Sequence, residues 1–199
     1  MHDRPAHTYS YFVGHFINEF SKLEFFLRRL LNEVSGLSRH DFAILIGNPR
    51  TEEVVSKLRK LTPHRLPADG QDDVTAALKQ LEQITRFRNW VVHYGGHDGL
   101  TDHPDKFLVR LPPTEVNEAT GGAYLLLERE EAWAAASDIL TISITVNGWL
   151  DPTHSSDVRP GRLPGGYPET PWRYKPPRLR QIQKQHPSAS RTQPRPPQS

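Results

Sequence analysis

Three side chains within one hexapeptide, residues 88–93, could together bind a phosphate and move a proton. Arg88 supplies a guanidinium, Asn89 an amide and His93 an imidazole. A guanidinium suits phosphate oxygens because it is permanently charged and presents several donors in a planar fork. An imidazole titrates near neutral pH and can serve as a general base or a general acid. The hexapeptide therefore indicates chemistry on a phosphodiester.

The hexapeptide closes a long helical pattern. Apolar residues recur at helical spacing from Asp72 to about His93, and the glycine pair 95–96 follows them. A first long helix is predicted over about residues 7–34, ended by Ser35 and Gly36. We expect the two long helices to run antiparallel and to carry the residues that position the hexapeptide.

Shorter elements fill the rest of residues 1–150, which we treat as one domain. The patterns predict helices from Ser38 to Ile46, from Thr51 to just before Pro63 and from Glu130 to Trp149, and strands over Lys106–Leu111 and Ala123–Glu128. The expected fold class is therefore all-α, a helical bundle of four to five helices with a short β-hairpin insertion.

Residues 151–199 differ in composition from this domain. They hold 11 of the 18 prolines, 9 of the 25 Lys/Arg and 3 of the 23 Asp/Glu. An acidic body with 16 basic and 20 acidic side chains is thus joined to a basic tail, although the net charge of the chain is only +2. Because the tail lacks apolar periodicity and is rich in proline and arginine, we expect it to be largely disordered.

The composition also excludes several classes of protein. The chain has no cysteine, which rules out a disulfide scaffold, thiol catalysis and a cysteine-based zinc site. Its first residues lack a signal-peptide pattern, and it has no apolar run of the length that a membrane span requires. We expect a soluble, cytoplasmic protein that needs no cofactor and does not enter a membrane.

Opposite charges interrupt the apolar faces of the two long helices. Glu24 falls within the apolar stripe of the first helix, and Arg88 falls in the middle of the stripe of the helix that ends at His93. An unpaired buried charge is strongly unfavourable, so we expect Glu24 and Arg88 to lie close together. They would form either a structural ion pair that fixes the register of the bundle or a pair in which Glu24 orients Arg88 toward a phosphate.

Asn89 and His93 project at the rim of the same apolar stripe, where a cleft would open. His93 is in the last helical turn, where the helix dipole favours the imidazolium form and where fraying would bring the ring toward Arg88. The alternative interpretation is a histidine that only interacts with the dipole or the backbone at a helix end.

The spacing of arginine and histidine is weak evidence taken alone. Four pairs in the chain have four to six intervening residues: Arg59/His64, Arg86/His93, Arg88/His93 and Arg180/His186. The stricter pattern Arg-Asn-x-x-x-His occurs once, at residues 88–93, and it stands at the end of a long amphipathic helix.

This segment resembles the signature of the HEPN superfamily (higher eukaryotes and prokaryotes nucleotide-binding). The resemblance covers roughly residues 7–150, including Phe16, Phe20 and Glu24 of the first helix. It implies a helical bundle that dimerises so that two copies of the motif face a shared cleft. It also implies a metal-independent RNase, often a toxin or defence effector, with an antitoxin or a nucleotidyltransferase as partner. Members paired with a nucleotidyltransferase carry a tyrosine two positions after the histidine, where this chain has Gly95.

These residues suggest cleavage of RNA by its own 2′-hydroxyl. His93 would act as general base on that hydroxyl, and Arg88 would stabilise charge on the phosphoryl oxygens. Asn89 would orient the substrate or the motif, and Glu24 would position Arg88. The other copy in a homodimer could supply a second His93 as general acid to the leaving 5′-oxygen, and the reaction needs no metal.

The residues around the motif form the predicted substrate-binding set. Arg86 would contact a phosphate, while Trp90 and Tyr94, with Phe87, would stack on bases. The alternatives are that the aromatic residues are core or dimer contacts and that Arg86 is a solvated surface charge.

Two other functions account for part of the same pattern. A non-catalytic module would bind RNA, a nucleotide or a protein partner, with the basic tail supplying positive charge that the acidic body lacks. The other alternative is a metal site formed by His93, His97 and His103. The spacing of these histidines crosses a glycine-rich stretch and follows no helical ligand pattern, which argues against a metal site.

Overall fold

The computed structural model describes residues 8–99, 104–113, 124–150 and 172–176. Within these ranges the order of elements is α1 (Tyr9–Ser35), α2 (Arg39–Leu45), α3 (Thr51–Arg65), α4 (Ala68–His93), β1 (Gly96–Asp98), β2 (Lys106–Arg110), β3 (Tyr124–Glu128) and α5 (Arg129–Gly148). The predicted helical fold with a small β insertion is confirmed. None of the described helices is both long and apolar enough to cross a membrane.

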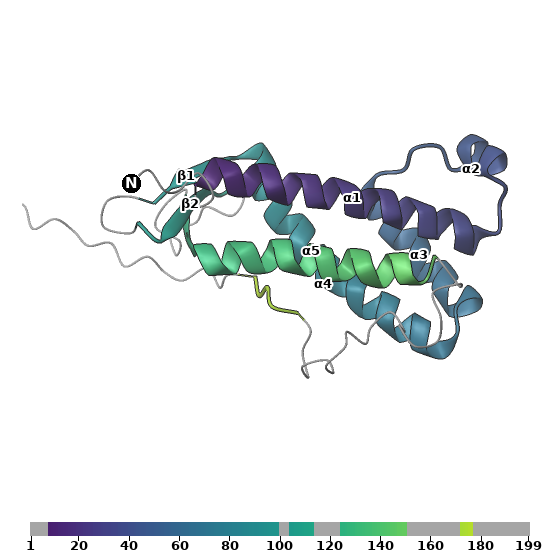
Figure 1. Cartoon of the computed structure of the whole chain (residues 1–199). Coiled ribbons are helices and arrows are strands. Elements are labelled where there is room, and N and C mark those ends of the chain that lie inside the picture. Colours follow the sequence, from purple (N-terminus) through teal and green to yellow (C-terminus); the bar gives the residue numbers. More distant parts are fainter. Residues whose placement is uncertain (1–7, 100–103, 114–123, 151–171, 177–199) are drawn as a thin grey trace, which may run out of the picture.

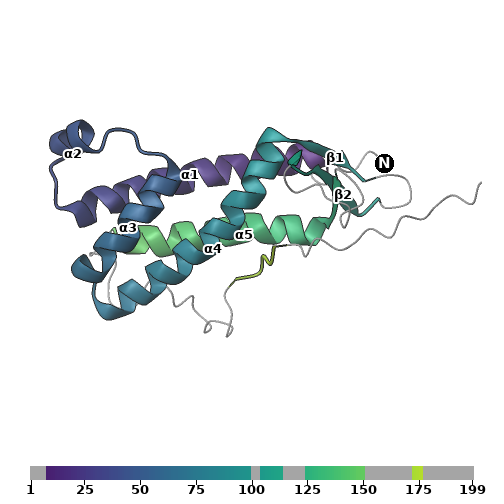
Figure 2. The same cartoon turned by 180° about the vertical axis from the view of Figure 1, so that it is seen from behind.

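The long helices are arranged around one core. α1 and α5 lie side by side along the molecule, and α3 and α4 pack behind them (Figures 1 and 2). α4 runs opposite to α1 and ends beside the small sheet, the end of the bundle at which α1 begins. α2 lies at the opposite end. The motif at the end of α4 is therefore held between the start of α1 and the sheet.

Local signals set most of the helix boundaries. The hydroxyl of Thr8 accepts a hydrogen bond from the backbone N–H of Tyr11 and caps α1, which ends at Gly36 with φ 70°. The hydroxyl of Ser38 caps α2 by accepting from the N–H of Asp41. The predicted end of α1 and the predicted cap of α2 are thus confirmed.

Two helix boundaries differ from the prediction. α3 continues through Pro63 to Arg65, because a proline near the end of a helix removes only one donor and the last turn still closes through Leu66 N–H to Thr62 O at 3.0 Å. α4 begins at Ala68, four residues before Asp72. Its start directly follows Pro67, whose fixed φ suits a helix entry.

The β insertion has three strands and not two. β2 pairs with β3 in antiparallel register, with Leu108 opposite Leu126, as a hairpin requires. β1 adds to the other edge of β2, with Gly96 opposite Val109. The sequence of β1 has no alternation of apolar and polar residues, so only its tertiary pairing makes it a strand.

Gly96 marks a close approach between this sheet and α1. A Cβ atom at Gly96 would clash with the backbone oxygen of Leu108 and would lie 2.8 Å from the hydroxyl of Tyr9. The Tyr9 side chain is buried, which raises its pKa to about 12. Only glycine therefore allows the chain after the motif to pack against α1.

Gly96→Ala is expected to lower the free energy of unfolding by about 1–3 kcal/mol, since neither backbone nor ring can yield easily. Gly14→Ala is the matched control, because a Cβ at Gly14 meets nothing within 4 Å. That change, inside α1, is expected to stabilise the protein by roughly 0.5–1 kcal/mol. Urea unfolding of both variants tests the packing, and equal stabilities would contradict it.

Phenylalanines join the motif end of α4 to α1 and the sheet. Phe12, Phe16, Phe87 and Phe107 are fully buried. The ring of Phe87 lies 5.4 Å from Phe16 in an edge-on arrangement, and the ring of Phe12 stacks on Phe107 at 5.4 Å. These contacts fix the position of the residue that directly precedes Arg88.

Residues 172–176 are a described segment of the tail that docks on the bundle, an exception within a region expected to be largely disordered. Tyr174 is buried in the bundle, and Trp172 packs partly against the core. Hydrogen bonds to Asp138 hold the backbone of this segment. The composition concealed the docking because two aromatic residues in a proline-rich stretch form no periodic pattern. The other residues of the predicted tail, 151–171 and 177–199, lie outside the described ranges.

Candidate functional site

Arg88 is half-buried on the face of α4 that contacts Phe20 of α1. Its guanidinium carbon lies 5.5 Å from the centroid of the Phe20 ring, and its Nη1 donates to Asn89 Oδ1 at 3.1 Å. Its Nε is buried and has no hydrogen-bond partner among the described residues. No described carboxylate lies within ion-pair distance of it. The ring and the amide therefore hold the guanidinium in place while its charge stays unneutralised.

Asn89 is half-buried beside Arg88. Because its Oδ1 accepts from Arg88, its amide nitrogen is directed away from the guanidinium and can donate to a ligand. A guanidinium and an amide donor at neighbouring positions are suited to the oxygens of one anion.

Glu24 does not pair with Arg88, so the predicted ion pair is wrong. Its Oε1 accepts a hydrogen bond from the hydroxyl of Thr51, the first residue of α3. A carboxylate is favoured at this place because the free N–H groups of a helix start carry partial positive charge. Arg88 instead reaches Phe20, one turn earlier in α1. The helical projection of the sequence correctly located Glu24 and Arg88 on the core-facing stripes of their helices. It could not give the offset of α1 relative to α4 along their axes, which decides which residue Arg88 meets.

Glu24→Gln is expected to reduce the free energy of unfolding by about 1 kcal/mol or less, because glutamine still accepts from Thr51 and only the interaction with the helix start is lost. Urea unfolding measures this effect. A loss of several kcal/mol would show that Glu24 is a buried charge with a larger structural role than the contact with Thr51.

His93 is the last residue of α4, and its side chain is exposed. The turn is not frayed, since Tyr94 N–H donates to Trp90 O at 3.0 Å. A separation of five residues along a regular helix places His93 about 140° around the axis from Arg88 and about 7.5 Å farther along it. The two side chains therefore point in different directions, and no hydrogen bond within the described residues joins them.

The predicted substrate-binding residues differ in exposure. Trp90 is only 4% exposed, so its ring cannot stack on a base, and we remove it from that set. Phe87 is fully buried and is excluded for the same reason. Arg86 is exposed and lies over the Trp90 ring at 5.2 Å. Tyr94 is 38% exposed next to His93, and its stacking on a base stays a prediction.

A groove of about 380 Å³ runs between α3 and α4. Thr51 and Thr85 are the lining residues farthest from the α3–α4 connection, and Thr85 precedes Arg88 by one helical turn. The ion pair between Arg59 and Glu82, 2.7 Å long, lies farther along the groove. The groove thus leads toward the motif and offers both hydroxyl groups and charged groups.

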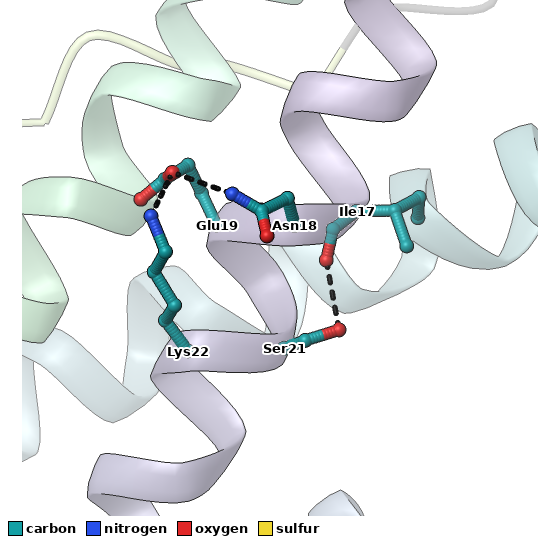
Figure 3. A network of polar contacts seen from close by, with 5 residues as sticks. All are labelled: Ile17, Asn18, Glu19, Ser21 and Lys22. Atoms are coloured by element: carbon teal, nitrogen blue, oxygen red, sulfur yellow. Dashed lines mark hydrogen bonds and ion pairs between the residues drawn. The ribbon is translucent and has the colours of Figure 1, made fainter.

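A second cavity, about 370 Å³, lies between α1 and α5 and includes His15 and Glu19 in its lining. Its carboxylate is already engaged, because Glu19 Oε1 accepts from Lys22 Nζ at 2.6 Å and from Asn18 Nδ2 at 3.2 Å (Figure 3). The ring of His15 lies 5.3 Å from that of Trp133. The residues that line this cavity belong to α1 and α5 and not to the motif helix α4, and we do not assign the candidate site to it.

No cluster of three or more histidine, aspartate or glutamate side chains in the described part of the chain could hold a metal ion. The third histidine of the metal site weighed from the sequence, His103, lies outside the described residues. His97 donates through Nδ1–H to the backbone oxygen of Asp98 at 2.7 Å, a local contact within β1.

Comparison of the chain with known protein families, curated proteins and solved structures gives no match. The site therefore stands on its own geometry. Arg88 and Asn89 form one unit with Phe20, and no hydrogen bond or ion pair among the described residues joins Glu24 or His93 to it. Sequence reasoning missed the contact of Arg88 with Phe20, because that contact depends on tertiary packing.

Proposed function

We propose that this protein is a metal-independent endoribonuclease of the HEPN type that acts as a homodimer on RNA. The observation that carries the proposal is the state of Arg88. Its guanidinium is half-buried, is held by Phe20 and Asn89, and lacks a carboxylate partner among the described residues. An uncompensated charge in such a position is unfavourable unless an anion binds to it, and a phosphodiester supplies that anion.

In this proposal each residue of the motif has a separate task. Arg88 binds the scissile phosphate and stabilises the charge that develops on its oxygens. The amide nitrogen of Asn89 donates to the same phosphate. His93 removes the proton of the 2′-hydroxyl, and the imidazole is accessible for this because it is exposed.

A second copy of the chain would bring Arg88 and His93 to the same phosphate. Within one chain they diverge by about 140° around the α4 axis. Val92, between them in sequence and one turn after Arg88, is 42% exposed. An apolar side chain left uncovered beside the motif is a suitable dimer contact. Two α4 helices meeting there would place His93 of one copy near Arg88 of the other.

The groove between α3 and α4 is the proposed path of the RNA strand away from the motif. Its lining includes Lys60 and the ion pair of Arg59 with Glu82, together with Thr51 and Thr85, whose hydroxyls can still accept hydrogen bonds. Tyr94 would stack on a base beside the cleaved bond. Stacking and base splaying favour single-stranded RNA over duplex RNA as the substrate.

We further propose that the protein acts in the cytoplasm as a toxin or defence effector, with an antitoxin or a nucleotidyltransferase as its partner. This part rests only on the resemblance of the motif. The absence of cysteine is compatible with a reducing compartment.

One observation favours a binding module without catalysis. His93 makes no hydrogen bond to Arg88 or Asn89, so the single chain could bind a phosphate without positioning a base near it. RNA, a nucleotide or an acidic protein segment would then occupy Arg88.

An RNA cleavage assay in EDTA separates the two functions. Unstructured RNA is incubated with the full chain and with the double variant Arg88→Ala/His93→Ala, purified in the same way. Cleavage by the parent chain alone supports the enzyme. Binding of RNA by the parent chain without any cleavage would replace the enzyme with the binding module.

A further inference from the structure

Asp138 is a charged residue buried in the middle of α5, and no step of the proposed reaction uses it. It is 1% exposed. Its Oδ1 accepts from the backbone N–H of Arg173 at 3.0 Å, and its Oδ2 accepts from the backbone N–H of Tyr174 at 2.9 Å. A buried carboxylate is tolerated only with such partners. Asp138 therefore depends on two consecutive peptide groups from residues 172–176.

Gln80 on α4 completes the set of polar groups that hold this segment. It is 5% exposed, and its Nε2 donates both to Asp138 Oδ2 at 2.7 Å and to the backbone oxygen of Tyr174 at 2.9 Å. The two side chains thus satisfy both the N–H and the C=O of Tyr174. Backbone groups that are paired in this way can be buried at little cost.

The side chains of the segment divide between the bundle and the solvent. Tyr174 is 2% exposed, its ring lies 5.5 Å from that of Phe87, and its burial raises its pKa. Trp172 is half-buried, whereas Arg173 and Lys175 are exposed. Successive side chains of an extended peptide point in opposite directions, so a buried Tyr174 between exposed Arg173 and Lys175 is the pattern of an extended peptide bound on one face.

We propose that Gln80, Asp138 and Phe87 form a peptide-docking site between α4 and α5, and that its ligand is the chain's own segment 172–176. The site recognises an extended peptide through its backbone and selects a tyrosine through the contact with Phe87. It anchors the C-terminal region to the bundle. Because Phe87 directly precedes Arg88, the bound segment also braces the end of α4.

The length of the intervening chain is compatible with this occupant. Gly148 ends α5, ten residues after Asp138, which corresponds to about 15 Å along the helix. The 22 residues that follow position 150 can span up to about 70 Å. The tether is thus longer than the return path, and it keeps the segment at a local concentration on the order of millimolar. A competing peptide should act only after the tether is cut.

The test uses the full chain with a specific protease site inserted between residues 151 and 171 and cut after folding. Size-exclusion chromatography should show the piece that contains residues 172–199 eluting with the bundle. Tyr174→Ala should release the piece after the cut, whereas Arg173→Ala should not, because Arg173 contributes its backbone and not its side chain. Release from the otherwise unchanged chain, or equal behaviour of the two variants, would overturn the proposal.

Synthetic peptides provide a second measurement that needs no substitution in the docking site or in the segment. A peptide with the sequence of residues 169–179 should displace the native piece from the cut chain. The same peptide methylated on the Tyr174 backbone nitrogen lacks the N–H that Asp138 accepts and should bind at least about 10-fold more weakly. Equal displacement by both peptides would show that Asp138 does not bind the peptide through the backbone N–H of Tyr174. That result would contradict the proposed docking site.

Discussion

Arg88→Ala is expected to reduce the rate of RNA cleavage by at least about 100-fold, the typical loss when a group that stabilises transition-state charge is removed. The physical reason is the charge of Arg88, which is held by Phe20 and Asn89 and is not neutralised by a carboxylate among the described residues. Arg88→Lys should recover only a small part of the activity. An ammonium keeps the charge but cannot reproduce the fork of donors. Single-turnover cleavage of labelled RNA measures both variants.

Arg29 offers a matched control for this substitution. Its guanidinium lies over the ring of Phe25 at 5.9 Å on α1, an arrangement similar to that of Arg88 over Phe20. Arg29→Ala also removes an arginine from an aromatic ring but leaves the motif intact. It should retain cleavage close to that of the parent chain. Equal losses for the two alanine variants would mean that Arg88 acts through stability and not through the phosphate.

His93→Ala is expected to lower cleavage by roughly 100- to 10,000-fold, the range that a general base contributes. His64→Ala is the control, because His64 is likewise an exposed histidine in the last turn of a helix, α3. Full activity of His93→Ala would remove His93 from the mechanism.

Mixing the two inactive variants examines whether the site is shared between copies. If Arg88 of one copy works with His93 of the other, a random mixture of Arg88→Ala and His93→Ala chains contains mixed dimers with one intact site. About a quarter of the parent activity should then return. If both residues act within one chain, the mixture stays inactive, and the divergence of Arg88 and His93 around α4 would need another explanation.

Much of the fold followed from local patterns in the sequence. The helix boundaries at Gly36 and Ser38 depend on capping side chains and on one glycine, and such signals act over a few residues. The position of the motif at the end of α4 was also predicted from a local pattern, because the helical spacing of apolar residues stops at about His93. Features that depend on pairing between distant segments were missed. β1 and the docking of Tyr174 both belong to this group.

The candidate site shows the same division between local and tertiary effects. The projection correctly placed Arg88 toward the interior, but its partner is Phe20 and not Glu24. A shift of one helical turn between packed helices is enough to exchange these partners, and a single sequence does not encode that shift in a readable way. Burial of Trp90 and exposure of Val92 likewise depend on where the neighbouring helices end.

The chemical nature of the RNA ends provides the most direct test of the proposed activity. Attack by a 2′-hydroxyl, assisted by His93 and Arg88, produces a 2′,3′-cyclic phosphate on one product and a 5′-hydroxyl on the other. The full chain in EDTA should yield these ends, and Arg88→Ala/His93→Ala should not. Products with a 3′-hydroxyl and a 5′-phosphate, or equal cleavage by the parent chain and the double variant, would contradict the proposed function.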